Sequence, residues 1–237
     1  MPSRKRVKSS GDRPKLVGVI ASPADLRLAL RMSRPPDLFE LRLDCLLGER
    51  QLEQKARALT VPLIITARHP AEGGNERLSS PLRRNLLLRF LPVAGYVDIE
   101  LRSAELFGAV VDRARRIGVS TIISFHDFGS TPPLGILRAK ASRAARIKGA
   151  VFKVVTRTDT PAQLGRLLQF MSTRRPRLRV CAMGMGRLGP VSRLLLAQCG
   201  SALIYTSLKE PRVDGQVSFE QFRAALRDFA ADGARIS

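Results

Sequence analysis

Short apolar runs rich in β-branched residues alternate with longer amphipathic segments along this chain, and the alternation occurs eight times. A short apolar run indicates a buried strand, whereas apolar positions at three- and four-residue spacing indicate a helix. The predicted strands comprise residues 16–21, 38–44, 62–68, 96–101, 120–126, 150–155, 178–184 and 202–208. Helical patterns follow them, for example at 103–117 and 160–171.

Eight strand-and-helix units predict an α/β fold, a single (β/α)8 TIM barrel over residues 16–237. The length of 237 residues and the hydrophobic content of 44% suit one such barrel, which typically takes about 250 residues. An open doubly wound sheet is the alternative, but no GxGxxG follows the first predicted strand. One catalytic domain is therefore expected.

Residues 1–15 form a basic, Gly- and Ser-containing tail that is expected to be disordered. The net charge of +21 offers an alternative function, a protein that binds nucleic acid through its phosphates. The arginines are spread over most predicted helices, however, and only Phe and two Tyr supply rings for base stacking. We therefore expect no nucleic-acid partner. The alternative predicts affinity for duplex DNA that falls by orders of magnitude between ~50 and ~200 mM salt.

The sequence contains no uncharged apolar stretch of 18 or more residues and no pattern of a secretory signal, so we expect a cytoplasmic protein without a membrane span. Its three cysteines are an odd number without CxxC spacing. This argues against a disulfide framework and against a zinc site. We expect free thiols at Cys45, Cys181 and Cys199.

Lys153 stands within the apolar run 150–155, where a charged side chain is costly unless chemistry or a partner requires it. The chain has 8 lysines against 33 arginines, and Lys153 is the lysine that lies in a predicted buried strand. Since arginine cannot form an imine, Lys153 is a candidate nucleophile. Apolar groups and cations around it would lower its pKa and leave a free amine that attacks a ketone. The alternative is a buried stem with an ammonium that reaches solvent.

An imine mechanism also needs a group that moves protons near pH 7, and the chain has two histidines. His126 ends the predicted strand next to that of Lys153, so in a barrel both side chains reach one substrate carbon. His69 lies in a predicted loop and is expected at the surface.

Other polar side chains gather where the predicted strands end, which is the face where barrel enzymes carry their active sites. Glu40, Arg42 and Asp44 share one face of the second strand, and a structural ion-pair layer is the alternative explanation for Glu40 and Arg42. A similar set on the fourth strand is interpreted as mainly structural: Asp98, Glu100 and Arg102. The Gly-rich residues 183–189 lack Walker spacing and are expected to form a plain βα turn.

The order and spacing of these motifs resemble those of type I 3-dehydroquinate dehydratases, enzymes of the shikimate pathway of aromatic amino-acid biosynthesis. The resemblance extends from Leu16 to about Phe229. It rests on residues 40–44 (ELRLD), 66–68 (TAR), 72–74 (EGG), 124–128 (SFHDF), 152–153 (FK), 192–193 (SR) and 215–216 (GQ). Each motif is short, whereas their combined order is specific.

This resemblance implies a lyase without cofactor or metal, expected as a homodimer. The enzyme would convert 3-dehydroquinate to 3-dehydroshikimate by syn elimination of water, through a Schiff base between Lys153 and the C3 ketone. His126 would take the C2 proton and later protonate the departing C1 hydroxyl, and Glu72 would orient His126. The substrate ring hydroxyls would meet three side chains: Glu40, Arg42 and Arg68. The substrate carboxylate would meet Arg193, at a helix N-terminus, and Gln216.

One position departs from the family pattern. Four residues before Gln216, where the family commonly has serine, this chain has Arg212. We expect Arg212 at the substrate site, either as an extra cation for the carboxylate or pointing to solvent. The alternative enzyme is another class I Schiff-base barrel, such as an aldolase, which would share Lys153 but need no carboxylate clamp.

Overall fold

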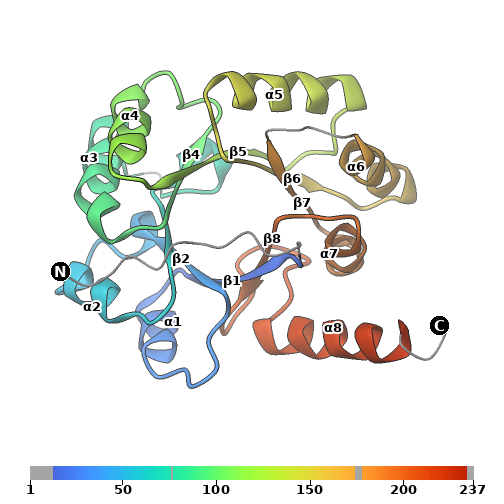
Figure 1. Cartoon of the computed structure of the whole chain (residues 1–237), viewed down its shortest axis with the longest axis horizontal. Coiled ribbons are helices and arrows are strands. Elements are labelled where there is room, and N and C mark those ends of the chain that lie inside the picture. Colours follow the sequence, from blue (N-terminus) through green and yellow to red (C-terminus); the bar gives the residue numbers. More distant parts are fainter. Residues whose placement is uncertain (1–12, 76, 174–177, 234–237) are drawn as a thin grey trace.

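The computed structural model of the chain describes residues 13–75, 77–173 and 178–233. Parallel strands surround a common axis, and helices cover their outer side (Figure 1). The strands are β1 (Lys15–Ile20), β2 (Leu38–Arg42), β3 (Leu63–Thr66), β4 (Tyr96–Glu100), β5 (Ser120–Asp127), β6 (Val151–Arg157), β7 (Arg179–Met185) and β8 (Leu203–Ser207). The predicted (β/α)8 barrel is confirmed.

The helices of the described ranges alternate with these strands. They are α1 (Pro23–Ala29), α2 (Leu52–Ala58), α3 (Ser80–Phe90), α4 (Gly108–Arg116), α5 (Leu134–Arg146), α6 (Pro161–Ser172), α7 (Gly189–Gln198) and α8 (Phe219–Gly233). Short 3-10 turns are η1 (Leu43–Cys45), η2 (Pro70–Glu72) and η3 (Leu91–Val93). Polar caps start several helices: Ser22 accepts from the Asp25 N–H, and Thr160 forms a capping box with Gln163. Such caps fix where a strand-to-helix loop ends.

The strand order β7-β6-β5-β4-β3-β2-β1-β8 brings β1 between β2 and β8. The remaining gap, between β7 and β8, is bridged by the Ala202 N–H, which donates to the Val180 carbonyl at 2.7 Å. The Cys181 thiol donates to the Leu203 carbonyl at 3.2 Å across the same gap. The sheet is therefore a nearly closed barrel.

The strands read as continuous apolar runs because both of their faces are buried. Outward-facing side chains pack against the helices, as Phe152 does against Phe170 of α6, with ring centroids 6.2 Å apart. Inward-facing side chains fill the barrel, for example Ile64 and Ile122. Because successive side chains alternate along a strand, Lys153 follows outward-facing Phe152 and points inward.

Several predicted boundaries were wrong, and contacts in the structure explain two of them. The strand predicted at 38–44 ends at Arg42, and Asp44 lies in η1 because its carboxylate turns back to bind the Arg42 guanidinium. The helix predicted at 103–117 starts only at Gly108. Turns precede it and bury Phe107, whose ring lies under the Arg83 guanidinium at 4.9 Å.

The predicted tail meets the barrel at its last residues. Lys15 begins β1, and Arg13 forms an ion pair of 2.6 Å with Asp37. The rest of the predicted tail lies outside the described residues. Within the described ranges, no helix has the length and apolar character needed to cross a membrane. The cysteines are free thiols, as expected: Cys45, Cys181 and Cys199.

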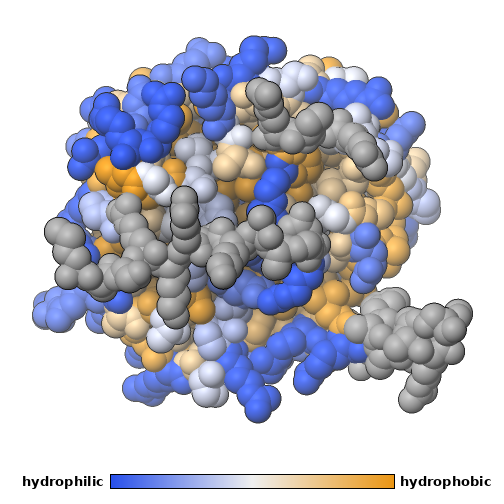
Figure 2. Space-filling model, viewed as in Figure 1, coloured by the Kyte–Doolittle hydropathy of each residue, from blue (hydrophilic) through white to orange (hydrophobic). Residues whose placement is uncertain are grey.

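The surface arginines lie on several sides of the barrel. Figure 2 shows hydrophilic side chains over much of the outer side of α3 and α4, with apolar residues between them. Exposed arginines occur on different helices: Arg27 on α1, Arg57 on α2, Arg89 on α3, Arg113, Arg115 and Arg116 on α4, and Arg138 on α5. Those at helix C-terminal ends offset the negative end of the helix dipole. The spread agrees with the distribution predicted from the sequence.

Candidate active site

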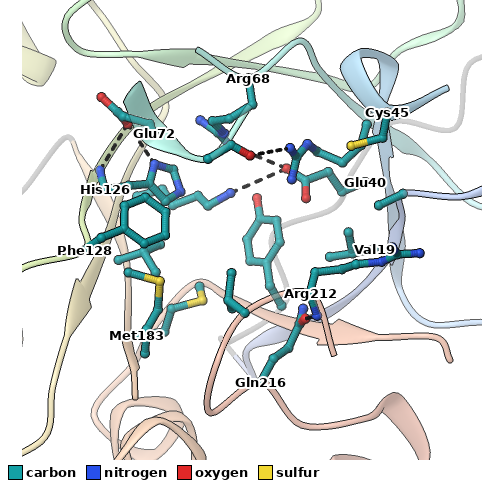
Figure 3. A pocket seen from close by; sticks show the side chains of 18 of the residues that line it. Val19, Glu40, Cys45, Arg68, Glu72, His126, Phe128, Met183, Arg212 and Gln216 are labelled. Atoms are coloured by element: carbon teal, nitrogen blue, oxygen red, sulfur yellow. Dashed lines mark hydrogen bonds and ion pairs between the residues drawn. The ribbon is translucent and has the colours of Figure 1, made fainter. Parts of the chain in front are cut away.

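A cavity of about 350 Å³ opens at the C-terminal ends of the strands (Figure 3). Its lining includes all the residues that the sequence analysis assigned to the site: Lys153, His126, Glu72, Glu40, Arg42, Arg68, Arg193, Arg212 and Gln216. In Figure 3, Glu72 and His126 occupy one side of the cavity, and Arg212 and Gln216 the opposite side. The fold brings the predicted residues together, and the role of each stays a prediction.

Lys153 carries an ammonium deep in this cavity. Its Nζ is 3.0 Å from Asp98 Oδ2, 3.5 Å from Glu40 Oε1 and 3.8 Å from the centroid of the Tyr205 ring. The side chain is 4% exposed, so the alternative of an ammonium that reaches solvent is wrong. The sequence analysis expected apolar groups and cations around this amine. It did not predict the two carboxylates, Asp98 and Glu40, that hold it.

Asp98 joins Lys153 to Arg68. The Arg68 guanidinium donates to both Asp98 carboxylate oxygens at 3.0 Å, and the Ser124 hydroxyl donates to Oδ1 at 2.6 Å. Burial acts to raise the pKa of Asp98, but Arg68 and Lys153 hold that pKa well below its usual range. The carboxylate is therefore ionised and fixes Nζ in place. Sequence reasoning interpreted Asp98 as structural. Like Lys153, Asp98 is a charged side chain within a buried strand, and this was the signal for a role at the site.

A second layer of charge supports Arg68 from behind. Glu100 accepts from Arg68 at 3.3 Å and from Arg83 of α3, which is fully buried. Glu100 also accepts the His69 N–H at 2.8 Å. Arg68 is 3% exposed and is already bonded to acids, so it reaches a ligand only at the cavity wall. His69 lies in a loop, as predicted, and its Nδ1 accepts the Ala71 N–H at 3.0 Å. Its side chain is half-buried rather than fully exposed at the surface.

Arg42 holds the loop that carries Glu72. Its guanidinium donates to both carboxylate oxygens of Asp44, at 2.9 and 2.7 Å, and Nη2 also donates to the Gly73 carbonyl at 3.1 Å. Gly74 lies so close to the Arg68 carbonyl that a Cβ there would be 2.0 Å from its oxygen. This contact explains why the loop needs glycine at this position. Arg42 is thus engaged in holding the loop, in addition to lining the cavity.

His126 and Glu72 form a hydrogen-bonded pair at the cavity wall. Glu72 Oε2 lies 2.8 Å from His126 Nδ1 and accepts the His126 backbone N–H at 3.1 Å. Burial, together with Arg68 and Lys153, holds the pKa of His126 well below its usual value. Burial also raises the pKa of Glu72 to about 7, although Arg68 opposes this. At neutral pH the imidazole is uncharged and is able to accept a proton.

Arg193 is a buried cation whose bonds go to backbone carbonyls. Its Nη1 donates to the carbonyls of Gly184 at 2.9 Å, Gly189 at 3.0 Å and Gly215 at 2.6 Å. Burial lowers its pKa to about 10, which leaves it charged at neutral pH. Among the described residues no carboxylate pairs with it. The arrangement therefore suits an anionic group of a ligand. Arg193 lies in the second turn of α7 rather than at its N-terminus as predicted.

The remaining sequence-based assignments concern the rim of the cavity. The βα turn predicted at 183–189 is shorter: β7 runs to Met185, residues 186–188 form the turn, and Gly189 begins α7. Arg102 lies 3.3 Å from Glu72 Oε1 and links the fourth strand to the loop of Glu72. Arg212 and Gln216 line the cavity from the β8–α8 loop, where the Arg212 N–H donates to Gln216 Oε1 at 2.7 Å.

Comparison with known proteins identifies the family. The sequence profile of the family described as type I 3-dehydroquinase matches residues 19–232. The chain belongs to the type I 3-dehydroquinase family. The resemblance drawn from the sequence is thereby confirmed.

Relatives of this family match most of the chain. The 3-dehydroquinate dehydratase of Pyrococcus abyssi is 31% identical over 196 residues, which cover 82% of this chain and 88% of the relative. That of Methanocella arvoryzae is 30% identical over 90% of this chain and 96% of the relative. The crystal structure of 3-dehydroquinate dehydratase from Geobacillus kaustophilus superposes with a TM-score of 0.83 at 26% identity, over 92% of this chain and 91% of that one.

The first prediction concerns Glu72 of this type I 3-dehydroquinase. An ionised Glu72 accepts the Nδ1–H of His126 and leaves Nε2 free to take a proton. A protonated Glu72 donates to Nδ1 instead, so that Nε2 carries the imidazole proton and is unable to accept another. Because the pKa of Glu72 is about 7, turnover should rise with pH through this region. Below it, turnover should fall by about tenfold per pH unit. Glu72→Gln should abolish this pH dependence, and pH profiles of kcat for both proteins test it. The same acid limb in Glu72→Gln would assign the limb to another group.

The second prediction concerns Arg193. Arg193→Met keeps an unbranched stem but removes the cation. The substrate should then lose ~2 to 4 kcal/mol of binding free energy, the contribution of a charged hydrogen bond, and the Michaelis constant for 3-dehydroquinate should rise accordingly. Arg187→Met, in the turn just before α7, is the matched control, because Arg187 is exposed and does not line the cavity. Steady-state kinetics and melting temperatures check both variants. An unchanged Michaelis constant in folded Arg193→Met would rule out the clamp.

Proposed function

We propose that this protein is a carbon–oxygen lyase that converts 3-dehydroquinate to 3-dehydroshikimate through an imine at Lys153. The observation that carries the proposal is a buried primary amine in the cavity, held by Asp98 and lying on the strand next to that of His126. Family membership and the names of the relatives support the substrate.

The imine forms at the substrate C3 carbonyl. The Lys153 ammonium gives up a proton, and its neutral Nζ attacks the carbonyl carbon. The resulting carbinolamine then takes up a proton and loses water to give an iminium ion. Asp98, at 3.0 Å, holds Nζ in place before attack and balances the positive charge of the iminium afterwards. The Tyr205 ring lies at 3.8 Å and stabilises the same charge through its face. The enclosed site thus favours a cation at this one nitrogen.

The iminium acidifies the neighbouring C2 carbon, from which His126 removes a proton. The C2–H electron pair moves into the enamine, which then expels the C1 hydroxyl while His126 returns a proton to it, so that water leaves. Hydrolysis of the product imine releases 3-dehydroshikimate and restores the amine. One imidazole serves both proton transfers, which agrees with a syn elimination on one face of the ring.

The remaining cavity residues match the polar groups of the substrate. Arg193 and Gln216 are placed to bind the carboxylate, and the Arg193 charge has no described acid as partner. Glu40 is placed to accept from a ring hydroxyl, since its Oε1 already takes the Thr66 hydroxyl at 2.8 Å and leaves further acceptor capacity. Arg42 and Arg68 complete the ring-hydroxyl set proposed for this wall.

The reaction as drawn uses only side chains of the protein, and chelation with EDTA should leave turnover unchanged. We also propose that the protein is a cytoplasmic homodimer, on the resemblance to its family. Sedimentation velocity that gives a monomer would contradict the dimer. A class I aldolase is the alternative enzyme, and turnover of 3-dehydroquinate separates the two.

The central prediction is that Lys153 is trapped by reduction. Incubation with 3-dehydroquinate and sodium borohydride should inactivate the enzyme and place the added mass on the peptide that contains Lys153, because an imine is reduced to a stable secondary amine. Lys153→Met should be neither labelled nor active. Lys148→Met is the matched control, since Lys148 is exposed on the loop before the same strand and should leave labelling unchanged.

His126→Ala separates imine formation from proton transfer in the same experiment. It should still be labelled at Lys153, while its turnover falls by roughly 10² to 10⁴, the usual contribution of a positioned acid or base. Dehydratase activity with an unmodified Lys153 peptide would exclude the imine mechanism. Near wild-type turnover of His126→Ala would remove this histidine from the reaction.

A further inference from the structure

The β8–α8 loop, residues 208–217, crosses one side of the cavity mouth. Arg212, Val213 and Gln216 of this loop line the cavity, and Figure 3 shows Arg212 and Gln216 together at its edge. A ligand that reaches Lys153 enters the cavity beside this loop. What holds the loop in place therefore bears directly on access and on the direction of the Gln216 side chain.

One end of the loop is fixed by backbone contacts with the β7–α7 turn. The Asp214 carbonyl accepts the Gly186 N–H at 2.9 Å, and the Gly215 carbonyl accepts from Arg193 at 2.6 Å. Gly215 has a φ of 73°, and a Cβ there would lie 2.2 Å from the Gly186 oxygen. This close approach leaves little freedom at the Gly215 end.

At the other end, Leu208 packs against the barrel core and Arg212 supplies an ion pair to α1. Arg212 Nη2 forms an ion pair of 2.9 Å with Asp25 Oδ2, which joins the loop to the first turn of α1. The Asp25 carboxylate is itself fixed, because Oδ2 accepts the Ala21 N–H at 3.2 Å and the Ser22 hydroxyl at 2.7 Å. Asp25 is 3% exposed and Arg212 is 40% exposed, so the arginine is the partner that is able to leave.

This contact also determines how Gln216 is presented. The Arg212 N–H donates to Gln216 Oε1 at 2.7 Å, which leaves the Nε2 amide hydrogens as the free donors of that side chain. The Arg212 charge is already matched by Asp25, whereas Arg193 has no described acid as partner. The two arginines at the cavity therefore have different tasks.

We propose that Arg212 is a positioning residue: its ion pair with Asp25 clasps the β8–α8 loop against α1 and aims the Gln216 amide at the substrate carboxylate. The proposal deepens the function proposed above and rests on it for the identity of the ligand. Arg212 acts through the loop and Gln216, and substrate enters when the exposed arginine releases the buried carboxylate.

Hydrogen exchange of the ligand-free protein tests the clasp without any substrate. The amides of Arg212 and Gln216 are both hydrogen-bonded within the loop, the second to the Val213 carbonyl at 3.1 Å. In Arg212→Ser and in Asp25→Asn, exchange of the peptide covering 208–217 should be about tenfold faster, as expected for an ion pair worth about 1.4 kcal/mol. Lys209→Ser is the matched control. Lys209 carries the same charge in the same loop but forms no ion pair with the described residues, so its replacement should leave exchange unchanged.

Kinetics of the same variants test the effect on the substrate. Arg212→Ser and Asp25→Asn should each raise the Michaelis constant by about tenfold and change kcat by less than about threefold. The double variant should match either single one, because both changes remove the same contact. Arg212→Lys should recover part of the loss. An asparagine at position 25 keeps an acceptor for the Ala21 N–H and the Ser22 hydroxyl, and melting curves verify that α1 is intact.

The outcomes separate this proposal from the proposed function. If Arg212→Ser raises the Michaelis constant while Asp25→Asn leaves it unchanged, Arg212 binds the carboxylate itself and the clasp is wrong. Additive effects in the double variant, or exchange in both single variants equal to that of Lys209→Ser, would also overturn it. If the wild-type protein does not turn over 3-dehydroquinate, the proposed function fails, and the exchange experiment still decides whether the clasp exists.

Discussion

The ionic contact between Asp98 and the two cations Lys153 and Arg68 is the constraint on which the site depends. Three strands meet in it, since Asp98 lies on β4, Lys153 on β6, and Arg68 just beyond β3. Buried charges are costly to desolvate, and this group is tolerated because each cation has an acid beside it. With Glu40, Glu100 and Arg83, this group contains equal numbers of acids and cations. The acids are Asp98, Glu40 and Glu100, and the cations are Lys153, Arg68 and Arg83. A nucleophilic amine is thus kept in the interior of a protein at a fixed position.

The barrel converts this charge arrangement into a reaction site through strand register. Ser124 lies directly beside Lys153, and His126 lies two residues farther along the same strand, beside Val155. The histidine is therefore displaced toward the cavity mouth relative to the lysine, by the rise of two strand residues. A substrate carbon attached to the lysine then has its neighbouring carbon on the side of the imidazole. The Glu72 loop closes over the imidazole from η2 and sets its hydrogen bonding.

The sequence predicted the barrel and the two central residues, because those signals are local. Strand and helix periods are visible in short windows, and Lys153 is conspicuous within an apolar run. The contacts that give these residues their surroundings are distant in the chain. Asp98 and Lys153 are 55 positions apart, and Arg212 and Asp25 are 187 apart. Pattern analysis therefore found Lys153 but missed its contacts with Asp98 and Glu40, although it placed Glu40 at the site. It assigned Arg212 to the substrate or to solvent and missed its contact with Asp25.

The residues proposed for covalent chemistry and those proposed for acid recognition come from different parts of the barrel. The first set lies on three neighbouring strands and one loop: Asp98 on β4, His126 on β5, Lys153 on β6 and Glu72 in the loop after β3. The second set lies elsewhere, with Arg193 on α7 and Arg212 and Gln216 in the loop after β8. The two sets meet only across the cavity. A change in the proposed recognition set therefore leaves the strands of the proposed catalytic set untouched. Substitutions in one turn and one loop are therefore enough to change which carboxylic acid the barrel binds. The exchange of serine for arginine at position 212 is one such substitution in the loop.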